Sequence, residues 1–343
     1  MATQSSSQIQ PSALTVGEPA GIGAEITVKA WQALRSQQDA PPFFVIDDPA
    51  RYGQFDVPIA SINHPANAAR AFSEALPIFP LTNSVTPTTG QPLAANAPAV
   101  LEAIEKAVKL TAAGLASAVV TNPIEKKVLV DAGFSFPGHT DYLGALTQNL
   151  PGASPFGPVM MLAGPSLRTV PVTVHTALAK VPTALTTQDI VAVGACVDRA
   201  LRVDFGIEAP RLVVAGLNPH AGEGGLFGHE DSDIIAPAIA KLRRQNIKCE
   251  GPLPADTLFH SERRAQYDAA LCMYHDQALI PVKTIDFHHT VNVTLGLPII
   301  RTSPDHGTAL DIAGKGIANP ASLISALTMA AQLATHRRHH RAP

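Results

Sequence analysis

Short apolar runs alternate with longer stretches of helical periodicity along most of this 343-residue chain. Short runs rich in β-branched residues are typical of strands, and apolar residues that recur every three or four positions are typical of helices. We expect strands at residues 13–16, 43–46, 116–120, 168–174, 211–215 and 269–273. We expect helices at residues 97–112, 187–203, 233–245 and 320–335, and an irregular connection or a short hairpin at 80–98. Alternation of this kind predicts an α/β fold.

Composition narrows the class of partner. The length suggests about two domains, and a chain with 46% hydrophobic and 15% charged residues can bury a core. A formal net charge of −3, with no basic block before the C-terminal tail, does not favour nucleic acid or anionic lipid as a partner. Cys196, Cys249 and Cys272 are too scattered for a disulfide framework or a cysteine zinc site, and neither a signal peptide nor a membrane span is visible. We therefore expect a cytoplasmic protein that acts on a small molecule.

The segment 303–320 is patterned like a loop that binds a nucleotide. Its glycines allow backbone to approach a ligand closely, and Asp311 can accept hydrogen bonds from the hydroxyl groups of a ribose. His306 and Asn319 can meet the edge of an adenine ring, and a surface loop rich in turn formers is the alternative. Because Asp311 would repel a 2′-phosphate and Ile312 offers no compensating charge, we expect NAD in preference to NADP. The expected cofactor contacts are His306, Gly307, Asp311, Ile312 and Asn319.

A competing nucleotide site lies near the N-terminus. The glycine-rich segment 17–25 follows an expected strand and precedes an expected helix, and Asp47 at the end of the next strand could bond a ribose. The segment matches neither G-x-G-x-x-G nor a P-loop. The missing third glycine argues against an ordinary N-terminal dinucleotide fold.

His175, His220 and His275 each follow the end of an expected strand. Ligands bind at the carboxyl ends of the strands in open α/β sheets, so the three imidazoles could meet on one metal ion. Glu223 and Asp276 stand close in sequence and could fix the orientation of an imidazole. Neutral imidazoles suit zinc or cobalt, whereas magnesium prefers oxygen ligands. For any single histidine, a structural role is the alternative.

A second group of residues suits an anion. His139 and Thr140 follow a glycine. Lys283 and Arg301 each end a short apolar run; the lysine offers a point charge and the arginine a planar guanidinium fork. Asn292 adds an amide. We expect these residues to bind a phosphate or carboxylate. For each cation, the alternative is an exposed position at the end of a strand with no ligand.

Six short motifs occur in order along the chain. They are Gly17-Glu-Pro-Ala-Gly-Ile-Gly23, Phe136-Pro-Gly-His-Thr140, Leu217-Asn-Pro-His-Ala-Gly-Glu-Gly-Gly225, Gly251-Pro-Leu-Pro-Ala-Asp-Thr257, Tyr274-His-Asp-Gln277 and Val291-Asn-Val-Thr-Leu-Gly-Leu-Pro298. With these motifs the chain, from about Leu14 to about Leu333, resembles the 4-hydroxythreonine-4-phosphate dehydrogenase family of the pyridoxine pathway. The segment 303–320 is also similar to the adenosine-binding loop of isopropylmalate dehydrogenase. Tyr142 departs from the commoner phenylalanine and adds a hydroxyl near the expected phosphate contacts.

The resemblance implies two α/β domains that flank a cleft, as in the isocitrate and isopropylmalate dehydrogenases. Residues 13–125 with 285–340 would form a discontinuous cofactor domain, residues 126–284 a metal, substrate and dimerisation domain, and residues 1–12 a disordered tail. The resemblance also implies a homodimer whose metal ligands are contributed across the subunit interface. Carried over by motif, His175, His220 and His275 match the family's metal ligands. His139, Thr140, Lys283, Asn292 and Arg301 match its substrate and phosphate contacts.

The resemblance further implies NAD-dependent oxidation of 4-phosphooxy-L-threonine, with decarboxylation to 3-amino-2-oxopropyl phosphate, in pyridoxal phosphate biosynthesis. The metal would be zinc first, with magnesium or cobalt as alternatives, and would acidify the alcohol and polarise the ketone. Asp256 is our candidate to relay the proton or orient the amine, with a turn-forming role as the alternative. A sugar-acid phosphate or a dihydrodiol carboxylate remains an alternative substrate. A metal-dependent phosphohydrolase is the alternative class, but it does not explain the nucleotide loop.

Overall fold

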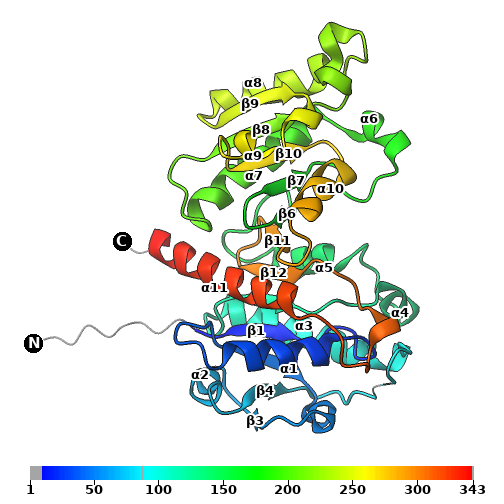
Figure 1. Ribbon diagram of the computed structural model, residues 1–343, viewed down its shortest axis with the longest axis vertical. Coiled ribbons are helices and arrows are strands. Elements are labelled where there is room, and N and C mark those ends of the chain that lie inside the picture. The colour runs from blue at the N-terminus through cyan, green and yellow to red at the C-terminus, as the bar shows by residue number, and fades with distance from the viewer. Residues whose placement is uncertain (1–9, 87, 342–343) are drawn as a thin grey trace, which may run out of the picture. The chain divides into compact units, whose positions relative to one another are not determined.

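The computed structural model describes residues 10–86 and 88–341, which divide into two compact units (Figure 1). The first unit contains the described residues up to Ala153 together with Pro298–Thr335, and the second contains Ser154–Leu297 and the described residues from His336 onward. Most of the tail expected at residues 1–12 lies outside the described residues, and Ser12 already begins the first strand. The expected domain limits at residues 125 and 285 remain a prediction.

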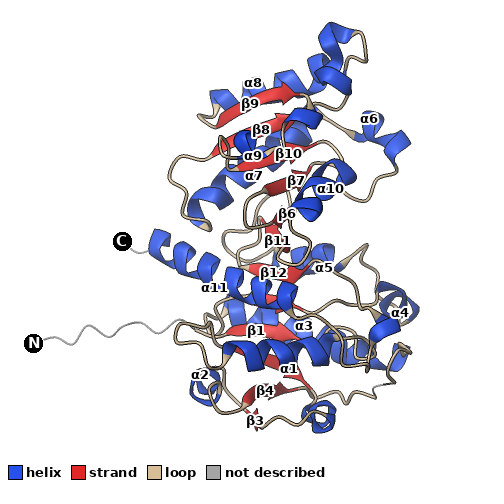
Figure 2. Ribbon diagram, in the orientation of Figure 1, coloured by secondary structure: helices blue, strands red, loops and turns tan. Residues whose placement is uncertain are grey.

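All strand pairs of the first unit are parallel, in the order β3-β4-β2-β1-β5-β12. The strands are β1 (Ser12–Thr15), β2 (Phe43–Asp47), β3 (Ile59–Ser61), β4 (Leu76–Pro80), β5 (Val119–Thr121) and β12 (Arg301–Pro304). Strands β1, β2 and β5 are buried at every position, as expected for parallel strands covered on both faces. In Figure 2, α1 and α11 lie in front of this sheet and α3 lies behind it.

The helices of the first unit connect these strands. They are α1 (Gly23–Leu34), α2 (Ala66–Ala71), α3 (Ala97–Ala112), α4 (Lys126–Asp131), α5 (His139–Thr147) and α11 (Ala321–Arg341), with 3₁₀ turns η1 (Pro49–Gln54), η2 (Ala94–Asn96) and η7 (Leu310–Ile312). Helix α3 packs against β1, β2 and β5. It presents alanines and branched residues to the sheet, among them Val100, Ile104 and Val108.

The second unit has a mixed sheet with the order β11-β6-β7-β10-β8-β9. Its strands are β6 (Val159–Ala163), β7 (Arg168–Pro171), β8 (Arg211–Ala215), β9 (Lys248–Leu253), β10 (Ala269–Cys272) and β11 (Val291–Leu295). Strand β6 is antiparallel to both of its neighbours, and the four strands from β7 to β9 are parallel. The functional histidines expected from the sequence follow three of these four parallel strands.

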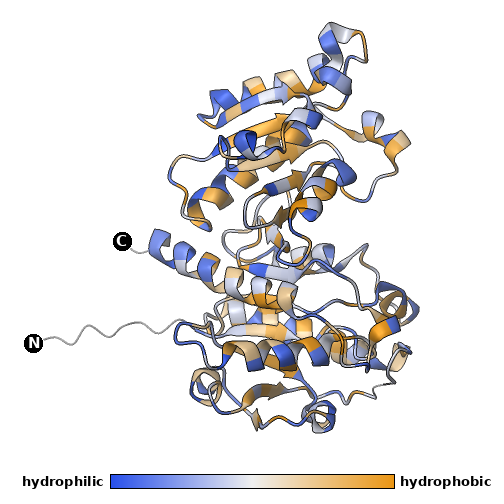
Figure 3. Ribbon diagram, viewed as in Figure 1, coloured by the Kyte–Doolittle hydropathy of each residue, from blue (hydrophilic) through white to orange (hydrophobic). Residues whose placement is uncertain are grey.

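The remaining elements of the second unit surround its sheet. They are η3 (Leu178–Lys180), α6 (Val181–Ala184), α7 (Thr187–Val203), η4 (Pro219–Gly225), the π-helical turn η5 (Asp231–Ile235), α8 (Ala236–Arg244), η6 (Ala255–Thr257), α9 (Ser261–Arg264) and α10 (His275–Ile285). One face of the sheet packs a cluster that includes Leu162, Val213, Cys272 and Val282. Figure 3 shows the apolar residues concentrated in the strands and on the helix faces toward them.

Several expected elements have the limits that the sequence indicated. Helices α3 and α7 and strand β8 begin and end at the predicted residues. Thr186 caps α7, since its hydroxyl accepts a hydrogen bond from the backbone N–H of Asp189. Helix α11 runs beyond its predicted end at Thr335, and β7 stops at Pro171 instead of continuing to residue 174. No described helix is long and apolar enough to cross a bilayer.

The glycine-rich segment after β1 serves close packing of backbone. Gly17 has a φ of 71°, and a Cβ there would lie 2.5 Å from the Cβ of Asn122 and 2.7 Å from the carbonyl oxygen of Pro123. A Cβ at Gly21 would lie 2.7 Å from the carbonyl oxygen of Thr308. These glycines therefore let the loops that follow β1, β5 and β12 touch one another.

Replacing Gly17 by Ala should lower the free energy of unfolding by at least about 2 kcal/mol, because a steric clash adds to the cost of a left-handed residue. Gly114→Ala is the matched control: Gly114 has a φ of 72° and nothing within 4 Å of the added Cβ. The control should cost only about 1 kcal/mol. Urea unfolding of both variants measures the difference. Equal losses would show that close packing is not what requires glycine at position 17.

Candidate active site

Three histidines of the second unit stand beyond the carboxyl ends of three neighbouring parallel strands. His175 follows β7, His275 begins α10 just after β10, and His220 lies in η4 after β8. Strand β10 pairs with both β7 and β8 in parallel register. The sheet therefore carries all three imidazoles to one edge, as the sequence predicted for a ligand site.

His175 and His275 come together. Their ring centroids are 6.0 Å apart, and both side chains line a cavity of about 370 Å³ that also includes Tyr274 and Asp276. The Nδ1 of His275 lies 2.7 Å from a carboxylate oxygen of Asp276. A carboxylate on Nδ1 fixes the tautomer that leaves the lone pair on Nε2, which is the arrangement of a metal-binding histidine. These two residues therefore fit a divalent metal ion.

His220 is not grouped with the other two imidazoles. It lies in a run of left-handed residues, with a φ of 52°, and its ring packs on Phe227 with centroids 6.0 Å apart. Asp231 holds the preceding chain by accepting hydrogen bonds from the N–H groups of Leu217 and Asn218. Within residues 10–86 and 88–341, no three His, Cys, Asp or Glu side chains are grouped closely enough to hold a metal ion. The set of three metal ligands stays a prediction.

The first unit contains a buried cation beside a histidine. Arg301 on β12 is buried, and its Nη2 donates to the hydroxyl of Thr121 at 2.7 Å. Burial lowers the pKa of Arg301 to about 10. Burial, and then the positive charge of Arg301, hold the pKa of His139 well below its usual 6.5. Both groups resist an added positive charge, and an anion would relieve that cost.

Backbone geometry adds to this preference for an anion. His139 and Thr140 form the first turn of α5, where unpaired N–H groups and the helix dipole favour negative charge. The Nε2 of His139 is buried and has no hydrogen-bond partner among the described residues. The structure thus brings together three of the five expected anion contacts: His139, Thr140 and Arg301.

Lys283 and Asn292 belong to the second unit. Lys283 lies in the last turn of α10, with its ammonium 5.8 Å from the centroid of the Phe287 ring. Asn292 lies on β11, and its buried Oδ1 has no hydrogen-bond partner in the described chain. A buried acceptor of this kind costs free energy unless a ligand or water donates to it. Asn292 therefore remains a candidate for contact with the substrate.

The predicted nucleotide loop connects β12 to α11. Asp311 is exposed in η7, and the buried Nε2 of His306 has no partner among the described residues. Asn319 has a structural role that the sequence analysis missed, because its Oδ1 accepts a hydrogen bond from Ala321 N–H at the start of α11. The amide nitrogen of Asn319 and the second lone pair of its Oδ1 are still available to an adenine edge.

The competing N-terminal nucleotide site is excluded by the surroundings of Asp47. This residue is fully buried, and its carboxylate lies 2.5 Å from Nη1 of Arg51 and accepts from the hydroxyl of Tyr52 at 2.9 Å. Arg51 also donates to the carbonyl oxygen of Pro19. Asp47 is thus committed to a structural network and cannot reach a ribose.

Comparison with known proteins settles the family. Residues 41–330 match the family model described as pyridoxal phosphate biosynthetic protein PdxA. The chain belongs to the PdxA family. It is 53% identical over 330 residues to a 4-hydroxythreonine-4-phosphate dehydrogenase of Caulobacter vibrioides, covering 96% of this chain and 98% of the relative.

Solved structures agree. The crystal structure of 4-hydroxythreonine-4-phosphate dehydrogenase from Klebsiella pneumoniae has a TM-score of 0.83 and 36% identity, covering 95% of this chain and 99% of that one. A terephthalate 1,2-cis-dihydrodiol dehydrogenase from Burkholderia xenovorans has a TM-score of 0.64 and 28% identity, covering 95% and 98%. These matches confirm the α/β fold class expected from the sequence.

The structure also places two other residues from the sequence analysis, Tyr142 and Asp256. The Tyr142 hydroxyl donates to a carboxylate oxygen of Glu105 at 2.9 Å, so it is engaged within the first unit. The ring of Tyr142 packs on Phe134 and Phe136. Asp256 is exposed in η6, and its proposed role in proton transfer is untested.

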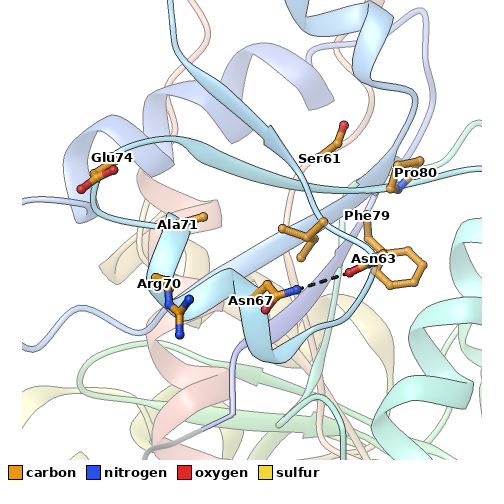
Figure 4. Close-up of a pocket in the computed structure, with 9 residues that line it drawn as sticks. Ser61, Asn63, Asn67, Arg70, Ala71, Glu74, Phe79 and Pro80 are labelled. Atoms are coloured by element: carbon orange, nitrogen blue, oxygen red, sulfur yellow. Dashed lines mark hydrogen bonds between the residues drawn. The ribbon is translucent and has the colours of Figure 1, made fainter.

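A larger hollow of about 750 Å³ lies at the outer edge of the first unit's sheet (Figure 4). Asn63 lines it from the segment after β3, Asn67 and Arg70 from α2, and Glu74 from the turn after α2, and all four are exposed. In Figure 4 the Asn67 amide points to the Asn63 side chain, with a distance of 3.3 Å. None of the expected site residues lines this hollow, so we do not assign the PdxA chemistry to it.

The low pKa of His139 predicts a pH effect on stability. Because the folded protein holds this pKa below the unfolded value of about 6.5, unfolding takes up a proton in acid, and stability should be lost as pH falls below about 6.5. Between about pH 7.5 and 5.5, the melting temperature of the variant His139→Gln should fall less than that of the wild type. Thermal unfolding at several pH values measures this. Parallel curves for the two proteins over that range would contradict the assignment.

Proposed function

We propose that the chain oxidises the secondary alcohol of 4-phosphooxy-L-threonine with NAD and releases the β-carboxylate as carbon dioxide. The product is 3-amino-2-oxopropyl phosphate, a precursor in pyridoxal phosphate biosynthesis. Arg301, buried on β12, and the partly buried His139 at the start of α5 carry this proposal, since together they suit the phosphate of such a substrate. The names of the relatives supply the reaction.

The phosphate contacts follow from charge and hydrogen bonding. Arg301 offers a planar fork, and the first turn of α5 offers backbone N–H groups beside His139 and Thr140. A neutral His139 can donate one hydrogen bond from its ring without repelling Arg301. We assign Lys283 and Asn292 to further contacts with the same phosphorylated hydroxy amino acid.

His175 and His275, with His220 as the third member, are the residues proposed to hold a divalent metal ion. Zinc comes first because the donors are imidazoles, with cobalt or magnesium as alternatives. When bound, such an ion acidifies an alcohol and polarises a ketone. Asp276 keeps the His275 ring oriented through their contact of 2.7 Å. We also infer a homodimer in which a metal set is completed across the subunit interface.

The remaining steps need a base and a hydride acceptor. Hydride leaves the carbinol carbon for the nicotinamide ring, and the hydroxyl proton leaves for a base. We assign that proton transfer, or the orientation of the substrate amine, to Asp256. The electrons of the broken carbon–carbon bond then pass toward the new ketone as carbon dioxide departs, and the enolate that remains takes up a proton from water at carbon to give the aminoketone.

The test is NADH formation by metal-depleted protein supplied with 4-phosphooxy-L-threonine and NAD, with and without zinc, magnesium or cobalt. We expect turnover that depends on the metal. Arg301→Lys should raise the KM for this substrate by about tenfold or more, since a point charge cannot replace the fork. Arg211→Lys is the control, because Arg211 is an exposed arginine paired with Asp268. Equal KM values for the two variants would remove Arg301 from the phosphate site.

Cofactor preference follows from Asp311. An exposed carboxylate in η7 can bond a ribose 2′-hydroxyl but repels a 2′-phosphate. We expect kcat/KM to favour NAD over NADP by at least about tenfold, and Asp311→Asn to narrow that ratio. Initial rates with both cofactors measure it. Equal efficiency of the wild type with NAD and NADP would show that Asp311 does not meet the ribose.

A second substrate class is favoured by one comparison. The similar terephthalate 1,2-cis-dihydrodiol dehydrogenase from Burkholderia xenovorans is named for a substrate that has carboxylates in place of a phosphate. A buried arginine fork can bind either anion. Turnover of a dihydrodiol carboxylate, without turnover of 4-phosphooxy-L-threonine, would move the assignment to that class and leave the oxidoreductase chemistry intact.

A further inference from the structure

The nucleotide loop is attached to helix α1 on both sides of Asp311. Before Asp311, the backbone N–H of Ile22 donates to the carbonyl oxygen of Thr308 at 3.1 Å. After Asp311, the backbone N–H of Ala318 donates to the Glu25 carboxylate at 2.8 Å. Ile22 and Glu25 are three residues apart, so they stand on the same side of the first turn of α1. One helix thus holds both sides of the loop.

Lys29 completes the second attachment. Its ammonium donates to the Glu25 carboxylate and to the carbonyl oxygens of Gly316 and Ala318, each at 2.8 Å. Glu25 is buried, and the Lys29 side chain is about one-third exposed. The two residues are spaced four apart, which lets one ion pair bond three backbone groups of the loop. We call Glu25 and Lys29 the α1 clamp.

The loop has few other means of support at this point. Gly314 and Gly316 have φ values of 75° and 72°, and they line a cavity of about 430 Å³ together with Glu25, Lys29 and residues of η1. Residues 314–317 are exposed. An exposed segment that borders a hollow depends largely on polar contacts for its ordered conformation. The α1 clamp supplies such contacts.

We propose that Glu25 and Lys29 are positioning residues that hold the nucleotide loop in the conformation that binds the adenosine part of NAD. This inference rests on the proposed NAD-dependent function. The clamp does not touch the reacting atoms. A loop that occupies its binding conformation only part of the time raises the apparent dissociation constant by the inverse of that fraction. Loss of the clamp should therefore act on the KM for NAD and leave kcat nearly unchanged.

The test variant is Lys29→Met, which keeps the length of the side chain and removes its three charge-assisted hydrogen bonds. We expect the KM for NAD to rise about tenfold, with kcat within about twofold of the wild type. Lys29→Arg should recover part of the loss, because a guanidinium can still donate to several acceptors. Without cofactor, hydrogen exchange in residues 306–319 should be faster in Lys29→Met than in the wild type.

The matched control is Lys106→Met. Lys106 on α3 also pairs with a glutamate four residues earlier, Glu102, at 2.7 Å, and it donates to the carbonyl oxygen of Pro80 at 3.1 Å. It therefore ties a different loop of the same unit by the same spacing. This control should leave the KM for NAD and the exchange of residues 306–319 unchanged.

Three outcomes would overturn the proposal. An unchanged KM for NAD in Lys29→Met, an equal rise in Lys106→Met, or unchanged exchange in the loop would each show that the clamp does not position it. Calorimetry of the wild type separates failure of the proposed function. If the wild type does not bind NAD, that function falls, and the cofactor role of the clamp falls with it, whatever the exchange shows.

Discussion

The parallel pairing of β1, β5 and β12 is the constraint on which the first unit depends. Parallel strands end at one edge, so the loops after these three strands meet there. Glu18 N–H donates to Pro123 at 2.8 Å, and Ile22 N–H donates to Thr308 at 3.1 Å, which joins all three loops through backbone. Side chains larger than hydrogen at Gly17 or Gly21 would separate them. The loop that we propose for cofactor binding consequently depends on the same contacts that join the three loops at the sheet edge.

Burial of positive charge gives this edge its chemistry. An arginine inside a sheet costs free energy unless its donors are satisfied, and the lowered pKa of Arg301 shows that its charged form is disfavoured. The neighbouring His139 responds by remaining neutral, since a second positive charge would add to the cost. A phosphate bound there, as we propose, would offset both penalties at once. Charge therefore favours ligand binding here more strongly than hydrogen-bond geometry alone would.

Hydrophobic patterns predicted the long helices and several short strands, and failed at strands that contain proline. Helices α3 and α7 could be placed from their helical periodicity. Strand β4 (Leu76–Pro80) contains two prolines, and β9 contains an internal Gly-Pro pair. Neither therefore has the composition from which a strand is predicted. Among site residues, the position of His175, His220 and His275 after strand ends predicted that the three could meet; the structure pairs His175 with His275, and the full set stays a prediction. The capping role of Asn319 and the pairing of Asp47 with Arg51 are local contacts, over two and four residues, that the sequence analysis missed. The attachment of the α1 clamp to Gly316 and Ala318 is a tertiary contact, which no local pattern encodes.

The two units differ in how far one chain completes its part of the site. In the first unit, the loop is tied at both ends and the anion contacts already adjoin, so ligand binding has little ordering entropy to overcome. In the second unit, His175 and His275 are paired, but His220 packs on Phe227 in a left-handed run that is costly for residues other than glycine. Such a run persists only where surrounding contacts enforce it, and Asp231 supplies several of them. Asp231 thus holds the chain just before η4, and the run of left-handed residues that follows carries His220 to Phe227, apart from His175 and His275.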